Sequence, residues 1–378
     1  MLVPPLDLMN RALNHWSHDR HHARQVQLPV TTTTAPLGLL RARLRMREAT
    51  ERALGLLILL AAAAWVVYNF VDEPKQCISV MLTGLNNGVL YALVALGYTL
   101  VYGIIELINF AHGDLFMLGT VFSANFLVNW LGFSSPGFEA SLALVLTFLL
   151  TMTFCALINV GAEFFAYRPL RRAPKLAPLI TAVGLSFVFQ NVGLKWNGST
   201  PKQWSNVITS GSFTVGGVPV HYSLFVTLGV TALLLFVLTF IVQHTKQGKA
   251  MRATAQDQDG ARLMGINVDR TISFTFALGG AAAGAAAVLS VQTLGTTRYD
   301  QGFQFGLVAF TATVLGGIGN LPGAVVGGVL IGLVQAANDG FPHGFGQDWS
   351  QTVLFTILIL VLVFKPEGLF GQRITEKV

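Results

Sequence analysis

Residues 221–243 read HYSLFVTLGVTALLLFVLTFIVQ, a run of 23 residues without Asp, Glu, Lys or Arg. At 1.5 Å per residue, a helix of about 20 residues crosses the roughly 30 Å hydrocarbon core of a bilayer. Such runs recur between residues 53 and 365, and only 11% of the chain is charged, against roughly 25% in soluble domains. Because backbone polar groups in lipid must be satisfied within the chain, these runs predict an all-α fold, a polytopic transmembrane helical bundle.

About ten membrane spans are expected, including an extra one at the N-terminus. That first span, residues 53–71, has no charged residue and follows five arginines between residues 41 and 52. It is typical of a signal-anchor helix, and its length favours an anchor over a signal peptide cleaved at the small residues 61–64. The other expected spans are 78–100, 103–128, 141–166, 176–194, 221–243, 271–293, 303–318, 321–337 and 349–365.

The positions of the basic residues predict the orientation. Short cytoplasmic loops are enriched in Lys and Arg. If the spans alternate from a cytoplasmic N-terminus, all but four of the 24 Lys and Arg residues lie in the cytoplasm, the exceptions being Lys75, Lys195, Lys202 and Arg298. Both termini are therefore expected in the cytoplasm, with the chain in a bacterial inner (plasma) membrane. The net charge of +6 fits contact with membrane lipid, and no nucleic-acid partner is expected.

Residues 1–52 differ from the rest of the chain. They contain eight arginines and a Thr cluster between two prolines, a composition typical of a disordered, basic cytoplasmic tail. His15, His18 and His22 would share one face of a helix, so metal binding is an alternative. The flexible tail is the favoured interpretation, because no carboxylate or Cys stands in register with these histidines.

Polar residues cluster in the span at 78–100. Asn87 and Tyr91 fall on one helical face, with Asn86 beside it. Polar side chains in a membrane span usually face a bundle interior or an aqueous path. Hydrogen bonding between helices explains the pattern as well as a translocation pathway does, and these residues are candidates for either role.

A second polar group lies in the expected span at 103–128. It comprises Glu106, Asn109, His112 and Asp114, with Glu106 and Asn109 on one side of the expected helix. Groups of this kind within lipid need partners or water, so they are predicted to line or brace the pathway. A proton relay through the histidine is an alternative.

Glycines are spaced for close helix packing. The stretch 316–328 resembles a nucleotide-binding loop only superficially, because Pro322 stands where the third Gly is required. The four-residue spacing instead predicts helix–helix contact at Gly280, Gly284, Gly323, Gly327, Gly328 and Gly332. The spans 303–318 and 321–337 are short, and a similar interrupted pair lies at 78–128, as in transporters built from inverted repeats.

The loop 244–270 is longer than a connector needs to be. Its centre, residues 251–265, is predicted to form a short helix. The small residues Ala253, Ala261 and Gly265 permit close docking, while Arg252, Asp257 and the other charged residues keep the loop soluble. The loop is therefore interpreted as a cytoplasmic docking element of the domain formed by residues 78–378.

Nothing in the sequence predicts an enzyme. No metal-ligand or nucleophile spacing rises above chance, so no catalytic, cofactor or metal residue is assigned. Cys77 and Cys155 lie at the start of and within apolar runs and are interpreted as packing residues.

Six segments occur in the order expected of one family of membrane proteins: NGVLYAL (87–93), GYTLVYGI (97–104), INFAHG (108–113), YRPL (167–170), LMGIN (263–267) and LGGIG (315–319). Through them, residues 78–378 resemble the branched-chain amino acid ABC transporter permease family, its LivH-like members in particular. Residues 1–71 depart from the usual shorter member.

The resemblance implies a permease subunit that forms the translocation pathway for Leu, Ile and Val. It implies four kinds of partner: a second related permease subunit, two cytoplasmic ATP-binding subunits that hydrolyse the ATP, a periplasmic substrate-binding protein and membrane lipid. By the same resemblance, Arg252–Gly265 is the coupling helix that sits in a groove of an ATPase subunit.

Two alternatives stay open from the sequence. A related importer for urea, short amides or other amino acids would share these scaffold motifs. A proton-coupled carrier or channel would centre on Glu106, His112 and Asp114, although the docking loop and the single intramembrane histidine argue against it.

Overall fold

In the computed structural model, the described residues are 55, 57, 60–105, 109–133, 135–171, 173–174, 176–204, 211–215, 217–365 and 367–371. The chain divides into two compact units, residues 1–60 and 61–378. The expected tail at 1–52, with its histidines, and Glu106 lie outside the described residues. Within the expected anchor at 53–71, the described part is mainly an apolar helix, Leu60–Asp72.

The second unit is built from helices. A π-helical turn, Asn125–Trp130, extends α4, and the turns Glu163–Tyr167 (π) and Arg168–Leu170 (3-10) extend α5. A 3-10 turn, Gln347–Trp349, precedes α13. The helices are α3 (Pro74–Ile105), α4 (Ala111–Ala124), α5 (Phe138–Ala162), α6 (Leu176–Asn197), α7 (Tyr222–His244), α8 (Lys246–Gln256), α9 (Gln258–Leu263), α10 (Val268–Leu294), α11 (Gln301–Gly316), α12 (Leu321–Gly340) and α13 (Ser350–Phe364).

Four short strands form two antiparallel pairs. Strand β1 (Lys202–Gln203) pairs with β4 (Thr296–Thr297), and β2 (Ser212–Val215) pairs with β3 (Val218–His221). Neither pair was expected from the sequence. The β2–β3 pair is a local hairpin, whereas β1–β4 joins segments far apart in the chain, and both leave the helical fold unchanged.

Among the described residues, seven helices are long and apolar enough to cross a membrane. The expected number of ten spans stays a prediction. The division expected between residues 100 and 103 is wrong, because α3 is continuous to Ile105 and the next helix begins at Ala111. The position of that break decides where Asn109 lies.

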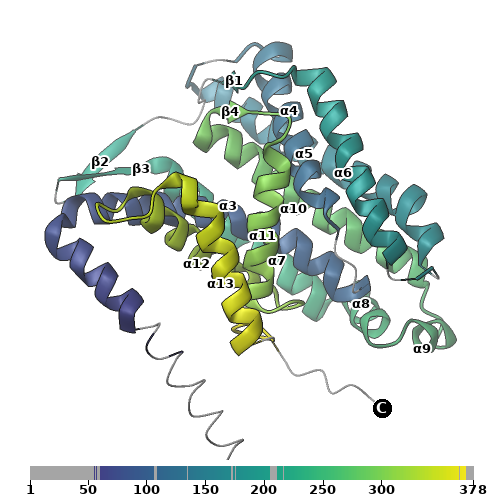
Figure 1. The fold of residues 1–378 in the computed structure, drawn as a ribbon. Coiled ribbons are helices and arrows are strands. Elements are labelled where there is room, and N and C mark those ends of the chain that lie inside the picture. Colours follow the sequence, from purple (N-terminus) through teal and green to yellow (C-terminus); the bar gives the residue numbers. More distant parts are fainter. Residues whose placement is uncertain are drawn as a thin grey trace, which may run out of the picture. The chain divides into compact units, whose positions relative to one another are not determined.

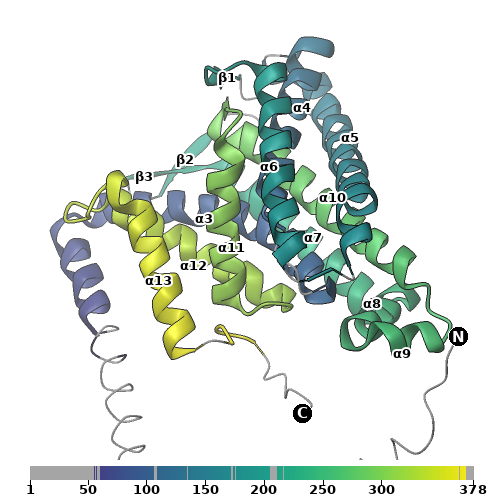
Figure 2. The same cartoon turned by 45° about the vertical axis from the view of Figure 1, so that its right-hand side comes forward.

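Helices α3 and α10 form the centre of the unit. In their most apolar stretches, 83% of α3 and 72% of α10 is buried, against 17% of α7 and 11% of α13. In Figures 1 and 2, α12 and α13 lie on one side of α11, and α5 and α6 lie on the other. The outer helices expose large apolar side chains such as Leu233 and Phe236 of α7, as a lipid-facing surface requires.

The glycine spacing identified in the sequence makes close helix packing, as predicted. A Cβ built on Gly328 of α12 would lie 2.6 Å from Cα of Ala92 in α3. A Cβ on Gly280 or Gly284 of α10 would lie 2.6 Å from a backbone oxygen of α5. Since real Cβ atoms do not approach this closely, only glycine allows these helices to touch through their backbones.

The ends of the helices gather at two ends of the unit. We call them the hairpin end, which bears β2–β3 and the start of α3, and the α8–α9 end (Figure 1). At the hairpin end, Ser79, Val220 and Leu294 line one cavity. At the other end, Ile104, Val242 and others line a second.

Candidate functional site

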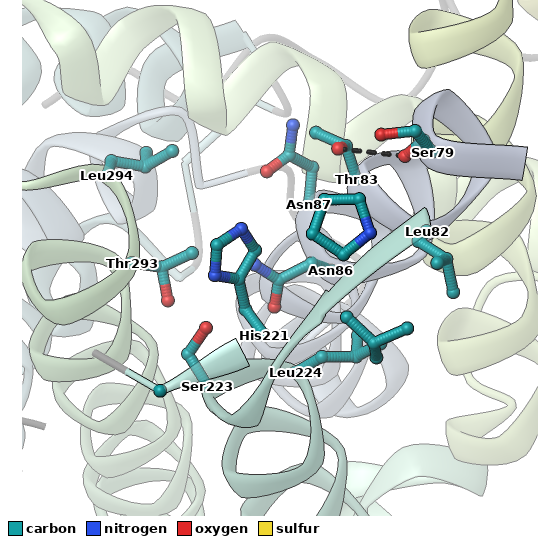
Figure 3. A pocket seen from close by; sticks show the side chains of 13 residues that line it. Ser79, Leu82, Thr83, Asn86, Asn87, His221, Ser223, Leu224, Thr293 and Leu294 are labelled. Carbon is teal, nitrogen blue, oxygen red and sulfur yellow. Dashed lines mark hydrogen bonds between the residues drawn. The ribbon is translucent and has the colours of Figure 1, made fainter. Parts of the chain in front are cut away.

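A cavity of about 480 Å³ lies at the hairpin end, between α3, the junction of β3 and α7, and the end of α10. Figure 3 shows Asn86, Asn87 and His221 facing the same space. The lining residues are Ser79, Leu82, Thr83, Asn86, Asn87, Gly211, Pro219, Val220, His221, Ser223, Leu224, Thr293 and Leu294. Its size lies within the usual range for small-molecule sites.

Local structure explains how these polar groups converge. Ser79, Thr83, Asn86 and Asn87 of α3 are spaced four, seven and eight residues from the first, so they share one helical face. His221 ends β3 and, in an extended conformation, precedes the first turn of α7. The sequence singled out the two asparagines. The i, i+4, i+7 spacing with Asn86 could have identified Ser79 and Thr83 as members of the same polar face. No sequence pattern pointed to His221 or Thr293.

The chemistry of this cavity suits a small, neutral or zwitterionic solute. Among the described residues, no Asp, Glu, Lys or Arg lines this cavity, whose lining combines amides, hydroxyls and an imidazole with four Leu and Val side chains. The side chain of Asn86 lines the cavity, and its Oδ1 is buried without a hydrogen-bond partner among the described residues. The cavity can therefore hydrogen-bond a polar head while an apolar side chain meets the aliphatic wall.

Tyr91 lies one turn deeper along α3 than Asn87 and is 6% exposed. Its hydroxyl donates to Oε1 of Gln335 in α12 at 2.8 Å, and its ring contacts Phe305 edge-on at 5.3 Å between centroids. Tyr91 does not line the cavity. It stands below the cavity floor, where α3 contacts α11 and α12.

Asn109 precedes α4 instead of lying within a span. The helical face expected to join it to Glu106 and Gly113 is not formed across this position, because α4 begins at Ala111. Oδ1 of Asn109 accepts from the backbone N–H of Ala111 at 3.1 Å and from the Tyr167 hydroxyl at 2.6 Å. Asparagine side chains favour such local bonds over helix interiors, which explains the break.

His112 and Asp114 are both buried within the bundle, apart from the cavity. His112 packs against Tyr98, with ring centroids 4.7 Å apart, and its two ring nitrogens have no partner among the described residues. Asp114 accepts hydrogen bonds from the Ser186 hydroxyl and, at 3.3 Å, from the Gln190 amide. These bonds tie α4 to α6.

A smaller cavity of about 100 Å³ opens at the α8–α9 end. It is lined by Thr99, Leu100, Gly103, Ile104, Val242, Met251, Arg252, Ala255, Gly319 and Leu321. Helix α3 lines both cavities. Twelve residues separate Asn87 from Thr99, about 18 Å along a helix, and in between Leu90, Leu93 and Leu96 are fully buried. Between these two cavities, α3 is therefore packed against its neighbours.

The docking loop contains two helices, where the sequence predicted one over 251–265. The break falls at Asp257, whose Oδ1 accepts from the backbone N–H of Asp259 at 3.0 Å and so caps α9. Asp is among the residues best suited to this N-cap position. Of the other residues predicted for docking, Arg252 donates to the carbonyl of Val242, and Ala253 packs against the core.

The tip of this loop is apolar. Ala261 is 4% exposed, so its small side chain serves packing within this chain, while Leu263 and Met264 are 88% and 84% exposed. Gly265 has a φ of +81° with nothing near its missing Cβ, a conformation that favours glycine. The exposed apolar surface of the loop is therefore centred on Leu263 and Met264 of the LMGIN motif, which were not among the residues predicted for docking.

A helical bundle with several candidate spans, a cavity at each end and an exposed apolar tip is the architecture of a multi-pass membrane permease. The chain belongs to the family described as branched-chain amino acid transport system / permease component, which matches residues 80–362. This membership confirms the resemblance carried by the six motifs.

Individual relatives cover most of the chain. It is 38% identical over 318 residues to the high-affinity branched-chain amino acid transport system permease protein BraD of Pseudomonas aeruginosa, covering 82% of this chain and 99% of that one. It is 36% identical over 304 residues to the permease protein LivH of Escherichia coli, covering 79% and 96%. It is 28% identical over 255 residues to the autoinducer 2 import permease LsrD of Escherichia coli, covering 64% and 72%. No solved structure matches.

Proposed function

We propose that this chain is the permease subunit of an ATP-driven importer for branched-chain amino acids. The observation that carries this proposal is the lining of the hairpin-end cavity. Its uncharged polar groups and four aliphatic side chains match a zwitterionic head on a branched apolar side chain. The relatives BraD and LivH are named for transport of the same substrates.

The pathway starts at Asn86 and Asn87 and passes Tyr91 on its way to the α8–α9 end. Asn109, His112 and Asp114 brace the helices that close it, since each is buried and two of them bond to other segments. Glu106 is assigned the same bracing role from its place in the sequence. Opening the pathway requires α3 to separate from its neighbours between Leu90 and Leu96.

The chain works with other subunits. Two ATP-binding subunits supply the energy, so this chain needs no cofactor of its own. A second, related permease completes the membrane domain, and a periplasmic binding protein delivers the amino acid at the hairpin end. The exposed pair Leu263 and Met264 supports docking of an ATP-binding subunit at the α8–α9 end, with Arg252, Ala253, Asp257, Ala261 and Gly265 shaping that tip.

The proposed setting is the bacterial inner membrane, with the α8–α9 end and both termini in the cytoplasm. Residues 1–52 then form a basic tail, residues 53–71 an anchor, and residues 78–378 the permease domain with its coupling loop at 244–270. The placement of the basic residues supports this orientation.

The function is tested by leucine uptake into proteoliposomes that contain the assembled complex and ATP. Asn86→Leu removes an amide from the cavity lining while keeping side-chain bulk, and uptake at low leucine should fall roughly 3- to 10-fold, the value of one good hydrogen bond. The matched control is Asn191→Leu, because the exposed amide of Asn191 bonds to Phe187 within its own helix.

Competition distinguishes the substrate classes. Unlabelled isoleucine and valine should compete with leucine, whereas urea and short amides should not. Wild-type uptake by the Asn86→Leu complex would contradict the assignment of the cavity. If urea alone competed with leucine, the proposed substrate would be wrong and urea would be proposed in its place.

A further inference from the structure

The motif Tyr167–Leu170 has no part in the function described so far. It follows α5 directly and lies at the α8–α9 end, beside the start of α10. Together with Glu163 and Arg171, it contacts two segments distant in the sequence: residue 269 on one side and residue 109 on the other. These contacts lead from the docking loop toward the interior of the bundle.

The first contact is a cluster of charges at the start of α10. Arg168 and Arg171 lie 2.5 and 2.6 Å from the carboxylate of Asp269. Asp269 is the second residue of α10, and it follows the exposed tip Leu263–Gly265 by only a few residues. Two guanidinium groups on one carboxylate make strong, directional bonds, so the 167–171 segment follows the start of α10 when that helix end moves.

The second contact anchors the segment to the helices. Glu163 is fully buried and accepts hydrogen bonds from Arg171 and, at 2.6 Å, from the Ser273 hydroxyl. A buried charge of this kind is costly to unpair. The end of α5, Arg171 and the first turns of α10 therefore behave as one body.

The third contact reaches the break between α3 and α4. Tyr167 is 3% exposed, its ring lies 5.7 Å from that of Phe276 in α10, and its hydroxyl donates to Oδ1 of Asn109 at 2.6 Å. The same oxygen accepts from the N–H of Ala111, and the carbonyl of Asn109 accepts from His112. Tyr167 thus contacts Asn109, which lies two residues before the start of α4.

We propose that residues 163–171 form a relay that transmits movement of the α9–α10 junction to the start of α4, with Tyr167 as a positioning residue for coupling. This inference rests on the proposed function. The helical structure is interrupted at Asn109, so no continuous helix joins α3 to α4. At this break α4 can shift relative to α3. Movement imposed by an ATP-binding subunit at Leu263 and Met264 would reach the closed part of the pathway by this route.

The ratio of leucine imported to ATP hydrolysed tests the relay in the assembled complex. Tyr167→Phe keeps the ring and removes the bond to Asn109, so ATP hydrolysis should persist while the ratio falls roughly 2- to 30-fold, the range for residues along a coupling route. Tyr68→Phe is the control, because the exposed Tyr68 ring packs at a tilt against His343, away from this segment. A Tyr167→Phe complex with the wild-type ratio overturns the relay.

A second measurement needs no partner subunit. Amide hydrogen exchange of residues 109–116 in the purified chain should quicken roughly threefold or more in Asp269→Asn, since disturbing Asp269 loosens Tyr167 and the bonds at Asn109. Asp269→Glu should restore slow exchange. Asp259→Asn is the matched control, because the exposed carboxylate of Asp259 pairs with the exposed Arg262 within α9.

The two measurements separate the possible failures. If the wild-type complex imports no leucine with ATP, the proposed function fails, and the exchange measurement still decides the relay. Unchanged exchange at 109–116 in Asp269→Asn overturns the relay even where uptake is intact.

Discussion

Asp114 shows how a single polar residue is accommodated inside the bundle. Its carboxyl group is fully buried, and no ion pair involving it is found among the described residues. Its oxygens instead accept from the Ser186 hydroxyl and the Gln190 amide. Because a buried polar group is tolerated only when it is hydrogen-bonded, the three side chains must be considered as one unit that joins α4 to α6.

Replacing Asp114 should reveal this dependence. Asp114→Leu leaves a hydroxyl and an amide without their acceptor, and we expect a loss of about 2–3 kcal/mol in stability. Asp114→Asn keeps an acceptor oxygen and should cost about 1 kcal/mol or less. Thermal unfolding in detergent, followed by size-exclusion chromatography, measures both. Equal stability of the leucine variant and wild type would show that these bonds contribute nothing.

Pairs of helices are held together through glycine. The contact between α3 and α12 is the most extensive between any two described helices, and Gly332 of α12 lies on the backbone of Gly88 in α3. In a membrane, helix association depends on close packing, since lipid is as apolar as the side chains it would displace. A methyl group added at this contact would therefore disturb the packing of α12 against α3.

Gly332→Ala should lower stability by about 1–3 kcal/mol, the usual cost of overpacking. Helix propensity alone would make a Gly→Ala change stabilising by up to about 1 kcal/mol. A loss of stability in Gly332→Ala would therefore come from the close contact between the helices. Gly229→Ala in α7 is the control, because its Cβ would meet nothing within 4 Å, and it should be neutral or stabilising. If both variants behave alike in a heat-stability assay, the close contact has no energetic role.

Within the unit formed by residues 61–378, the helix ends that line the two cavities lie in two groups. The hairpin end brings together the start of α3, the β3–α7 junction and the end of α10, and the α8–α9 end brings together the opposite ends of α3 and α7. Helices α3 and α7 each line one cavity at one end and the other cavity at the opposite end, as a membrane-crossing arrangement requires.

Cysteine labelling tests the orientation of the two ends. A membrane-impermeant maleimide applied from outside should label a cysteine at position 202 and spare one at position 263, since only four basic residues are assigned to the outer side. The native Cys77 and Cys155 are both fully buried, so background labelling in intact cells should be low. Labelling of position 202 only from the cytoplasmic side would show that the orientation is the reverse of the proposed one.

Much of the architecture could be predicted from local patterns. The uncharged run at 221–243 is a membrane-length helix, and the spacing of Gly280, Gly284, Gly328 and Gly332 predicts the helix faces that touch. The positions of Asn86 and Asn87 on a central helix also follow from the sequence. These features depend on residues within a few turns of one another, where the helical repeat alone sets the geometry.

Tertiary structure decided which polar groups meet. Asn109 bonds to Tyr167 and Asp114 to Ser186, pairs 58 and 72 residues apart, and no local pattern encodes such partners. The same holds for His221 and Thr293, which reach the hairpin-end cavity from separate elements. The sequence by itself determined a helical membrane permease and the close-packing faces of its helices. The cavity lining and the chain of contacts from Asp269 to Asn109 arise only when distant helices pack, because side-chain hydrogen bonds depend on atomic positions that hydropathy and periodicity do not specify.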